Sequence, residues 1–395
     1  MAPSSSRTDR AYDLVVFGAS GFTGRLTAEY LAEHAPADLR WALAGRNRGK
    51  LEKVREDLHR RFGELGELEI LEADVNDPAS VRRVAEATGV VITTVGPYLE
   101  YGEPLVAACA EVGTDYVDLT GEPEFVDRMW LSYDATAKAS GARIVHACGF
   151  DSIPHDLGAQ FTVEQLPDDQ PLTLKGYVRA GGTFSGGTFA SALTAFSRAR
   201  QMASTHAQRR RVEPRPENRR VRAVTGRPGY DSAVGRWVLP FPSLDPQVIA
   251  HSARALPEYG PDFTYSHFIA LKDPFTAAGL AVGTGSLFAL AQLPPTRAAL
   301  QRLRPSGSGP SAEQREKGWF SVRFVGEAAD GTTVRTEVRG GDPGYGETAK
   351  MLAESALCLA LDDVPVTSGS VTTAVAMGPA LRQRLTANGI TFRML

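Results

Sequence analysis

The feature that most constrains the fold is a glycine-rich loop near the start of the chain. Gly18, Gly21 and Gly24 follow the apolar run Tyr12–Phe17 and precede the helical pattern Phe22–His34. The run predicts a buried strand, and the pattern predicts an amphipathic helix. Glycines at such a junction allow a tight turn out of the strand and let the helix pack close to the sheet. The sequence therefore predicts that the chain opens with a β-α-β unit.

The alternation of strand and helix continues to about residue 150. The expected strands are Arg40–Ala44, Leu68–Ala73, Val90–Thr94, Asp115–Leu119 and Arg143–Ala147. The expected helices are Lys50–Phe62, Asp77–Ala87 and Glu103–Val112. Asp77 and Pro78 are typical of an N-cap and of the first helical position. Strict alternation predicts an α/β fold, with residues 1–150 forming a Rossmann domain around a doubly wound parallel sheet.

After residue 150 the sequence favours a different architecture. Apolar and polar residues alternate, as in half-buried antiparallel strands, along Leu172–Ala180, Trp319–Glu327 and Thr332–Arg339. Asp330-Gly331 predicts a hairpin turn between the last two strands. We expect residues 151–340 to form a second α+β domain on a largely antiparallel sheet, for substrate binding or dimerisation. The helix Glu347–Leu361 then belongs to a C-terminal segment, 341–395.

Composition limits the classes of function. The 395 residues are 43% hydrophobic and 23% charged, as in ordinary globular proteins of two or three domains. The net charge of -3 offers no basic field for nucleic acid. Cys109, Cys148 and Cys358 form no CxxC pair, which argues against structural zinc and fits a reducing compartment. The polar N-terminus lacks the apolar core of a signal peptide, so we expect a cytoplasmic protein.

The glycine loop also predicts a dinucleotide site. Backbone N–H groups and the positive dipole end at a helix N-terminus attract a pyrophosphate. The second predicted strand ends in Arg46 and Asn47, where NAD enzymes place a carboxylate. A guanidinium pairs with a 2′-phosphate, so the sequence favours NADP(H). The residues expected to bind it are Gly18, Ser20, Gly21, Phe22, Thr23, Gly24, Arg46, Asn47, Asp74, Gly96, Pro97 and Tyr98.

Several enzyme classes lack their sequence patterns in this chain. None of the eleven tyrosines has a lysine four residues later, as the proton-transfer pair of short-chain dehydrogenases requires. No HExxH motif or His/Cys cluster is present, so the sequence predicts no metal site. A GxSxG elbow, typical of hydrolases, is also missing.

Longer motifs resemble those of the saccharopine-dehydrogenase-like oxidoreductases, in particular the branch of trans-acting enoyl reductases of lipid and polyketide synthesis. The motifs are VVFGASGFTGRL (15–26), LAGRNRGKLEKV (43–54), TVGPYLEYGEPLVAACAEVGTDYVDLTGE (94–122), CGFDSIPHDLGA (148–159), SGGTFAS (185–191) and GDPGYGETAKMLAESAL (341–357). The resemblance spans nearly the whole chain. It implies an NADP-binding Rossmann domain, a β-rich second domain, and a C-terminal segment that packs back on the first.

Four residues are candidates for proton transfer or orientation. Tyr98 follows the fourth strand, at the sheet edge where ligands bind, although an aromatic residue at the rim is an equally simple interpretation. His146, Asp151 and His155 surround Cys148-Gly149-Phe150, after the sixth strand. Histidine is a natural general acid near neutral pH. A hydrogen-bonded core histidine at 146 and a turn at 151 remain alternatives.

Two segments have unusual composition. Residues 198–227 hold ten arginines and no lysine, which predicts either a solvated, partly mobile loop or a patch that docks a phosphate-bearing carrier. Residues 275–293 carry no charge, and we expect a buried or subunit-interface helix, with peripheral membrane contact or a true span as alternatives. A homodimer and membrane association are therefore both open.

Three functional hypotheses follow. The first is an NADPH-dependent reductase acting on an enoyl thioester, either free or held on a carrier. The second is a reductase of C=N bonds in imine or amino-acid chemistry, and the third is a non-catalytic NADP-binding protein of lipid surfaces. An enoyl thioester requires hydrogen-bond donors for its enolate and a proton for the α-carbon.

Overall fold

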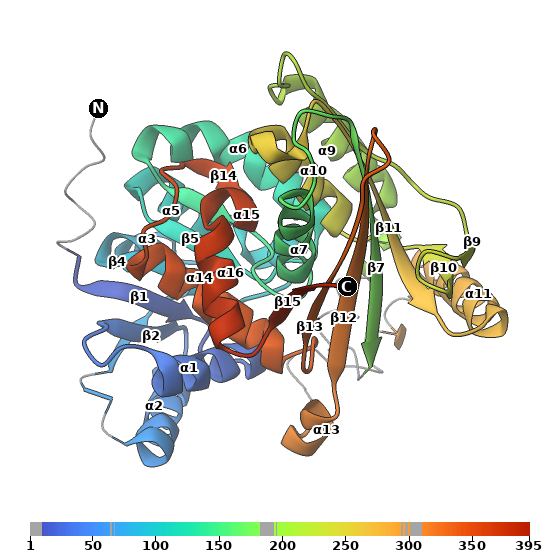
Figure 1. Ribbon diagram of the computed structural model, residues 1–395. Coiled ribbons are helices and arrows are strands. Elements are labelled where there is room, and N and C mark those ends of the chain that lie inside the picture. The colour runs from blue at the N-terminus through green and yellow to red at the C-terminus, as the bar shows by residue number, and fades with distance from the viewer. Residues whose placement is uncertain are drawn as a thin grey trace. The chain divides into compact units, whose positions relative to one another are not determined.

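The computed structural model describes residues 10–63, 65–66, 68–181, 193–194, 196–293, 295–296, 299–300 and 310–395. The quoted motif at 185–191 therefore lies outside the described residues. The chain divides into two compact units (Figure 1). Unit 1 comprises 1–149, 307–309 and 345–384, and unit 2 comprises 150–306, 310–344 and 385–395.

Unit 1 is built on a seven-stranded parallel sheet in the order β14-β6-β5-β4-β1-β2-β3. Its strands are β1 (Tyr12–Phe17), β2 (Trp41–Gly45), β3 (Glu69–Glu72), β4 (Thr88–Thr93), β5 (Asp115–Asp118), β6 (Arg143–Val145) and β14 (Gly369–Val371). Strand order reverses between β1 and β4, the place where open parallel sheets bind ligands at their carboxyl ends. The predicted doubly wound α/β sheet is confirmed.

Helices connect and cover the strands of unit 1. They are α1 (Phe22–His34), α2 (Arg48–Phe62), α3 (Pro78–Ala87), α4 (Tyr98–Tyr101), α5 (Glu103–Val112), α6 (Pro123–Ser140), α14 (Gly346–Leu361), α15 (Thr373–Ala376) and α16 (Gly378–Ala387), the last of which reaches into unit 2. α1 packs against α2 and α14, whereas α5 packs against α3 and α6. Asp77 caps α3 with Pro78 in its first turn, as its sequence predicts.

Unit 2 is built on an eight-stranded mixed sheet, ordered β15-β13-β12-β7-β11-β10-β9, with β8 paired to β11. Its strands are β7 (Leu172–Gly181), β8 (Arg220–Ala223), β9 (Gly229–Asp231), β10 (Arg236–Pro240), β11 (Asp262–Leu271), β12 (Trp319–Ala328), β13 (Thr333–Gly340) and β15 (Thr391–Met394). β7 and β8 run parallel to β11, and the other pairs are antiparallel. The largely antiparallel second sheet is thus confirmed, with its predicted hairpin at Asp330-Gly331.

Fewer helices accompany this second sheet. They are α7 (Ile153–Val163), α9 (Ala199–Val212), α10 (Asp245–Ala255), the 3-10 turn η1 (Pro257–Tyr259), α11 (Pro274–Ala291) and α13 (Ala312–Glu316). α7 packs on β12, β13 and α10, and α10 in turn packs on β8 and β11. These contacts bring the N-terminal ends of α7 and α10 together beside β11.

The structure differs from the sequence expectations in three places. The expected loop at 198–227 contains α9 and β8, and α9 ends at Val212, just before Pro214. The segment 275–293 forms α11, but only Ala277 and Ala291 of that helix are buried, so the expectation of a buried helix within the chain is wrong. Residues 385–395 belong to unit 2, because β15 pairs with β13.

Candidate functional site

The loop between β1 and α1 has a geometry that requires glycine at two positions. Gly18 has a φ of +90°, in the left-handed region, and its N–H donates to the Ala44 carbonyl at 2.8 Å. A Cβ on Gly24 would lie 2.2 Å from the carbonyl oxygen of Gly18. The first turn of α1 therefore lies directly against the end of β1, as a dinucleotide-binding loop requires.

The N-terminus of α1 is suited to an anion. Gly21 is the N-cap, and no described side chain caps this end of the helix. Ser20 is exposed, while Phe22 and Thr23 are half-buried. The partial positive charge of the helix end favours a phosphate there. The geometry of the loop fits a bound pyrophosphate, and the individual roles of these residues stay predictions.

Arg46 is the cation at the carboxyl end of β2. Its side chain is exposed and has no ion pair within the part of the chain that the structure describes. Its neighbours are occupied, since Asn47 caps α2 by accepting from the Lys50 N–H at 2.9 Å and Arg48 pairs with Glu52 at 3.1 Å. An exposed guanidinium without a partner fits the 2′-phosphate of NADP.

Asp74, Gly96 and Pro97 lie after β3 and β4, at the same edge of the sheet. The Asp74 carboxylate accepts from the backbone and side-chain N–H groups of Asn76, both at 2.9 Å, which holds the turn after β3. The loop after β4 is held by Glu122, whose carboxylate accepts from the N–H groups of Tyr98 and Leu99 at 3.1 and 2.9 Å. Both loops are thereby shaped around the crevice.

Tyr98 lies buried at the start of α4. Its hydroxyl donates to the Thr93 carbonyl and accepts from the Leu119 N–H, each at 3.1 Å. Burial, with the negative charge of Asp118, raises the pKa of Tyr98 well above its usual range. The hydroxyl thus joins the ends of β4 and β5, which is a positioning role; its predicted proton transfer stays a prediction.

Asp118 and His146 form a buried pair at the ends of β5 and β6. His146 Nδ1 lies 2.7 Å from Asp118 Oδ2, and both side chains are at most 5% exposed. Asp118 also accepts from the Tyr116 hydroxyl at 3.0 Å. His146 Nε2 has no hydrogen-bond partner in the described structure. Asp118 therefore fixes the orientation of a ring whose second nitrogen remains available.

The backbone after His146 is strained. Ala147 has a φ of +60°, a conformation that non-glycine residues rarely adopt. Asp118 supports it, since its carboxylate accepts from the Ala147 N–H at 2.8 Å. Such strain persists where the surrounding structure imposes it, and it is common at functional sites. The same carboxylate thus positions both the imidazole and the next peptide.

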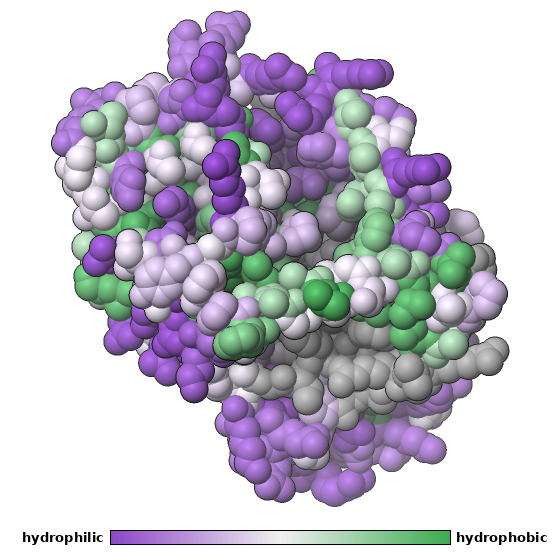
Figure 2. Space-filling view, turned by 90° about the vertical axis from the view of Figure 1, so that its right-hand side faces the viewer, coloured by the Kyte–Doolittle hydropathy of each residue, from purple (hydrophilic) through white to green (hydrophobic). Residues whose placement is uncertain are grey.

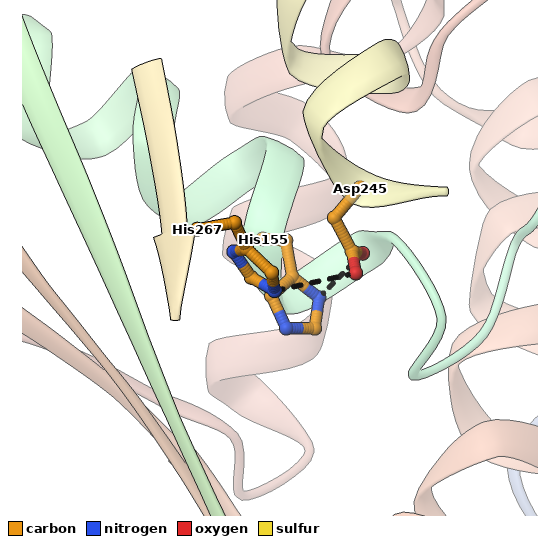
Figure 3. Close-up of side chains that lie close together, drawn as sticks. All are labelled: His155, Asp245 and His267. Atoms are coloured by element: carbon orange, nitrogen blue, oxygen red, sulfur yellow. Dashed lines mark ion pairs between the residues drawn. The ribbon is translucent and has the colours of Figure 1, made fainter. Parts of the chain in front are cut away.

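A second buried cluster lies in unit 2, where His155 of α7, Asp245 of α10 and His267 of β11 converge (Figure 3). Asp245 Oδ1 lies 3.0 Å from His155 Nδ1, and Asp245 Oδ2 lies 3.5 Å from His267 Nε2. Each side chain is at most 3% exposed. Burial lowers the pKa of His267 to about 4, although the charge of Asp245 opposes this shift.

Asp151 lies close to this cluster, just before α7. Burial raises the pKa of Asp151 to about 6, and the neighbouring charge of Asp245 raises it further, against the opposing effect of His155. The structure therefore brings two predicted residues, Asp151 and His155, into one environment. The other two, Tyr98 and His146, gather around Asp118 in unit 1. Their catalytic roles stay predictions.

Sequence reasoning missed Asp245 and His267. Asp245 begins α10, a helix that was not anticipated, and its carboxylate resembles an ordinary helix start. His267 carried a usable signal, because it shares the alternating face of β11 with the buried aromatic residues Phe263 and Tyr265. A histidine on an otherwise apolar strand face needs a polar partner inside the fold.

Comparison with known proteins confirms the family. A family model described as the saccharopine dehydrogenase NADP binding domain matches residues 14–145. One relative from Mycobacterium tuberculosis is 38% identical, and the match covers 98% of each chain. Proteins named trans-acting enoyl reductase from Mycobacterium bovis and Mycobacterium ulcerans are 35% and 34% identical, again over 98% of each chain. The chain belongs to the trans-acting enoyl reductase family.

Among solved structures, a saccharopine dehydrogenase from Saccharomyces cerevisiae has a similar fold. It aligns with a TM-score of 0.56 over 97% of this chain and 100% of its own, at 13% identity. At this identity the likeness supports the fold alone. The family model and the relatives confirm that this trans-acting enoyl reductase family member is an oxidoreductase with NADP(H) as cofactor. The loop at 18–24 and Arg46 fit that cofactor.

Proposed function

We propose that the protein reduces the C=C bond of an enoyl thioester in polyketide or lipid synthesis. The observation that carries the proposal is the full-length similarity to relatives named trans-acting enoyl reductase. The exposed, unpaired Arg46 at the end of β2 supports NADPH as the reductant. Bound NADPH supplies the hydride.

The chain must supply a proton to the α-carbon of the reduced thioester. His146 is the candidate that the geometry favours, because Asp118 holds its Nδ1 and leaves Nε2 without a partner. A carboxylate on Nδ1 stabilises the protonated ring and orients it, as in other His–Asp pairs. Tyr98 is less suited, since both hydrogen-bonding positions of its hydroxyl are used within the sheet edge.

A substrate held on an acyl carrier suits the arginine-rich part of unit 2. Arg210, Arg211, Arg215, Arg220 and Arg227 are exposed. Burial lowers the pKa of Arg254, and the neighbouring charges of Arg209, Arg210 and Arg215 lower it further, so these cations lie near one another. Such a positive surface favours an acidic carrier or its phosphate-bearing arm.

We also propose that α11 contacts a membrane, so that the protein is cytoplasmic and membrane-associated. By length and composition this helix qualifies as a membrane span. Phe275 and Val282 are 86% and 69% exposed, and hydrophobic residues gather on the face of the molecule shown in Figure 2. At about 100° per residue, the exposed large residues Phe275, Leu280, Val282, Phe288 and Leu290 point in all directions around the helix axis. One flat protein partner covers one side of such a helix, whereas lipid surrounds it.

The test of the reaction is NADPH oxidation with enoyl thioesters, cyclic imines and oxo acids. We expect turnover of enoyl thioesters alone, and a higher kcat/KM for the carrier-bound thioester than for its coenzyme A analogue. Charge reversal at Arg210 and Arg211 removes that advantage if this surface docks the carrier. Arg335→Glu is the matched control, because Arg335 is exposed elsewhere in unit 2. Turnover of imines alone would contradict the proposal.

The proton donor is tested by His146→Gln. We expect kcat to fall by about 10²–10⁴-fold, the usual contribution of a general acid, while the Kd for NADPH stays unchanged. The pH dependence of kcat separates this role from a structural one, because the variant should lose the alkaline limb. An unchanged kcat and pH profile would exclude His146 as the donor.

A further inference from the structure

We propose that His155, Asp245 and His267 form a binding site for a divalent first-row transition metal ion, with zinc as the simplest occupant. One ligand atom from each residue lies within 4.8 Å of the other two. The three side chains come from α7, α10 and β11 and point toward one another (Figure 3). All three belong to unit 2, so the site is complete within that unit.

The distances suit a metal that is not yet bound. Donor atoms around a four-coordinate zinc ion with bonds of about 2.1 Å lie roughly 3.4 Å apart. Asp245 Oδ1 and Oδ2 lie 3.0 and 3.5 Å from the facing nitrogens of His155 and His267. Small side-chain rotations therefore suffice to bring the three donors onto one ion. Two imidazoles and one carboxylate are a ligand set that zinc and iron(II) both use.

The cluster leaves polar atoms unsatisfied, which is the second observation in favour of a ligand. The buried atoms without a hydrogen-bond partner in the described structure are His155 Nδ1, His155 Nε2, Asp245 Oδ1 and His267 Nε2. The close approach of His155 Nδ1 to Asp245 Oδ1 is thus not aligned as a hydrogen bond. Such atoms are rare and costly in proteins, and a missing ion or water is a common explanation.

Neighbouring groups are arranged as second-sphere partners. The Tyr265 hydroxyl lies 2.7 Å from His267 Nδ1, so the free position of that ring is Nε2, which faces Asp245. The Ser243 hydroxyl lies 2.5 Å from Asp245 Oδ2. Metal-binding histidines and carboxylates are usually held in this way. The ring of Phe150 packs edge-on against His155 with centroids 5.4 Å apart, which adds an apolar wall.

Two other candidates resemble this site less. Water alone could satisfy some of the four atoms, but it would leave two imidazoles and a carboxylate pointing at one another. A structural His–Asp pair explains one histidine and not the second. The sequence patterns for metal sites did not reveal the cluster, because its ligands come from three separate elements.

The test is metal binding by the full-length protein. Chelator-treated protein is titrated with Zn²⁺ by calorimetry, and with Co²⁺ by its visible d–d absorption, which intensifies in a low-coordinate site. We expect one ion per chain and a Kd in the micromolar range or below. His267→Gln and Asp245→Asn should each weaken binding at least a hundredfold, whereas His251→Gln, a histidine of α10 outside the cluster, should leave it unchanged.

Folding is checked separately by circular dichroism and thermal melting. The cobalt spectrum of the wild type is informative even where a variant does not fold, since it reports the ligands directly. Absence of stoichiometric uptake by the wild type would overturn the proposal, and so would uptake that His267→Gln and His251→Gln reduce equally. Because binding is measured without substrate or NADPH, the result is independent of the proposed reductase activity.

Discussion

At the scale of single residues, the cofactor site depends on a few positions with no substitute. Gly18 adopts a φ of +90°, and a Cβ on Gly24 would collide with the Gly18 carbonyl. Arg46 acts differently, because its exposed guanidinium makes no contact that the fold requires within the described residues. The glycines thus determine whether a dinucleotide binds, and Arg46 determines which one is preferred.

Replacing Arg46 should change cofactor preference without affecting folding. Arg46→Ala removes a charged hydrogen-bond partner of the 2′-phosphate, worth about 1.5–3 kcal/mol, so the Kd for NADPH should rise roughly 10- to 100-fold. The Kd for NADH should stay the same. Fluorescence titration with both nucleotides measures the difference. Arg48→Ala is the matched control, since Arg48 pairs with Glu52, and equal effects of the two variants would contradict the assignment.

At the scale of elements, α11 is the part of the molecule least explained by its own fold. Its 18 residues span about 27 Å at roughly 1.5 Å each, close to the thickness of a bilayer core of about 30 Å. Ala277 and Ala291 are its buried residues. An apolar helix that is exposed on all sides is expected to meet a lipid phase or another apolar surface.

Membrane contact by α11 is tested by flotation with vesicles of phosphatidylcholine and phosphatidylglycerol. Wild-type protein should float with the vesicles, and Leu280→Asp combined with Val282→Asp should abolish this, because a charge in the apolar phase is costly. Val366→Asp is the control, since Val366 is 98% exposed on a different segment. A second copy of the chain is the competing partner. Loss of a dimer in the α11 variant, without flotation of the wild type, would favour that interpretation.

At the scale of the whole molecule, stability in acid depends on a carboxylate that joins three strands of unit 2. Glu337 of β13 accepts from the Ser321 hydroxyl of β12 at 2.8 Å, from Arg323 of the same strand at 2.9 Å, and from Arg393 of β15 at 3.0 Å. It is 2% exposed. Burial alone would raise its pKa, but these hydrogen bonds lower the pKa of Glu337 from 4.5 to about 2.

The sign of the resulting pH dependence follows from this lowered pKa. Because the folded pKa lies below the unfolded value, Glu337 stabilises the protein fully above about pH 4.5, and the contribution is lost as the pH falls toward 2. The shift corresponds to about 3 kcal/mol. Glu337→Gln should therefore lower the free energy of unfolding by about this amount at pH 7, and by much less at pH 2.5. Urea denaturation at both values measures it, with the exposed Glu327→Gln as control. Equal losses at both pH values would contradict the assignment.

The sequence alone determined the parts of this protein that depend on local patterns. The glycine loop, the alternation of strand and helix, Arg46 and the hairpin at Asp330-Gly331 are each readable within a few residues, because turns, strand ends and helix starts follow local rules. The quoted motifs likewise predicted the family. α9 was predicted only by its end, since proline breaks a helix but does not reveal what precedes it.

Only the tertiary structure decided what lies far apart in the chain. It joined Asp118 to His146 and Tyr98, and it brought Asp245 and His267 to His155. It also left α11 exposed, although an uncharged helix of that composition is equally typical of a core. Burial and side-chain convergence depend on which elements pack together, and local sequence does not determine that packing. The site residues could be nominated from sequence, but their partners could not.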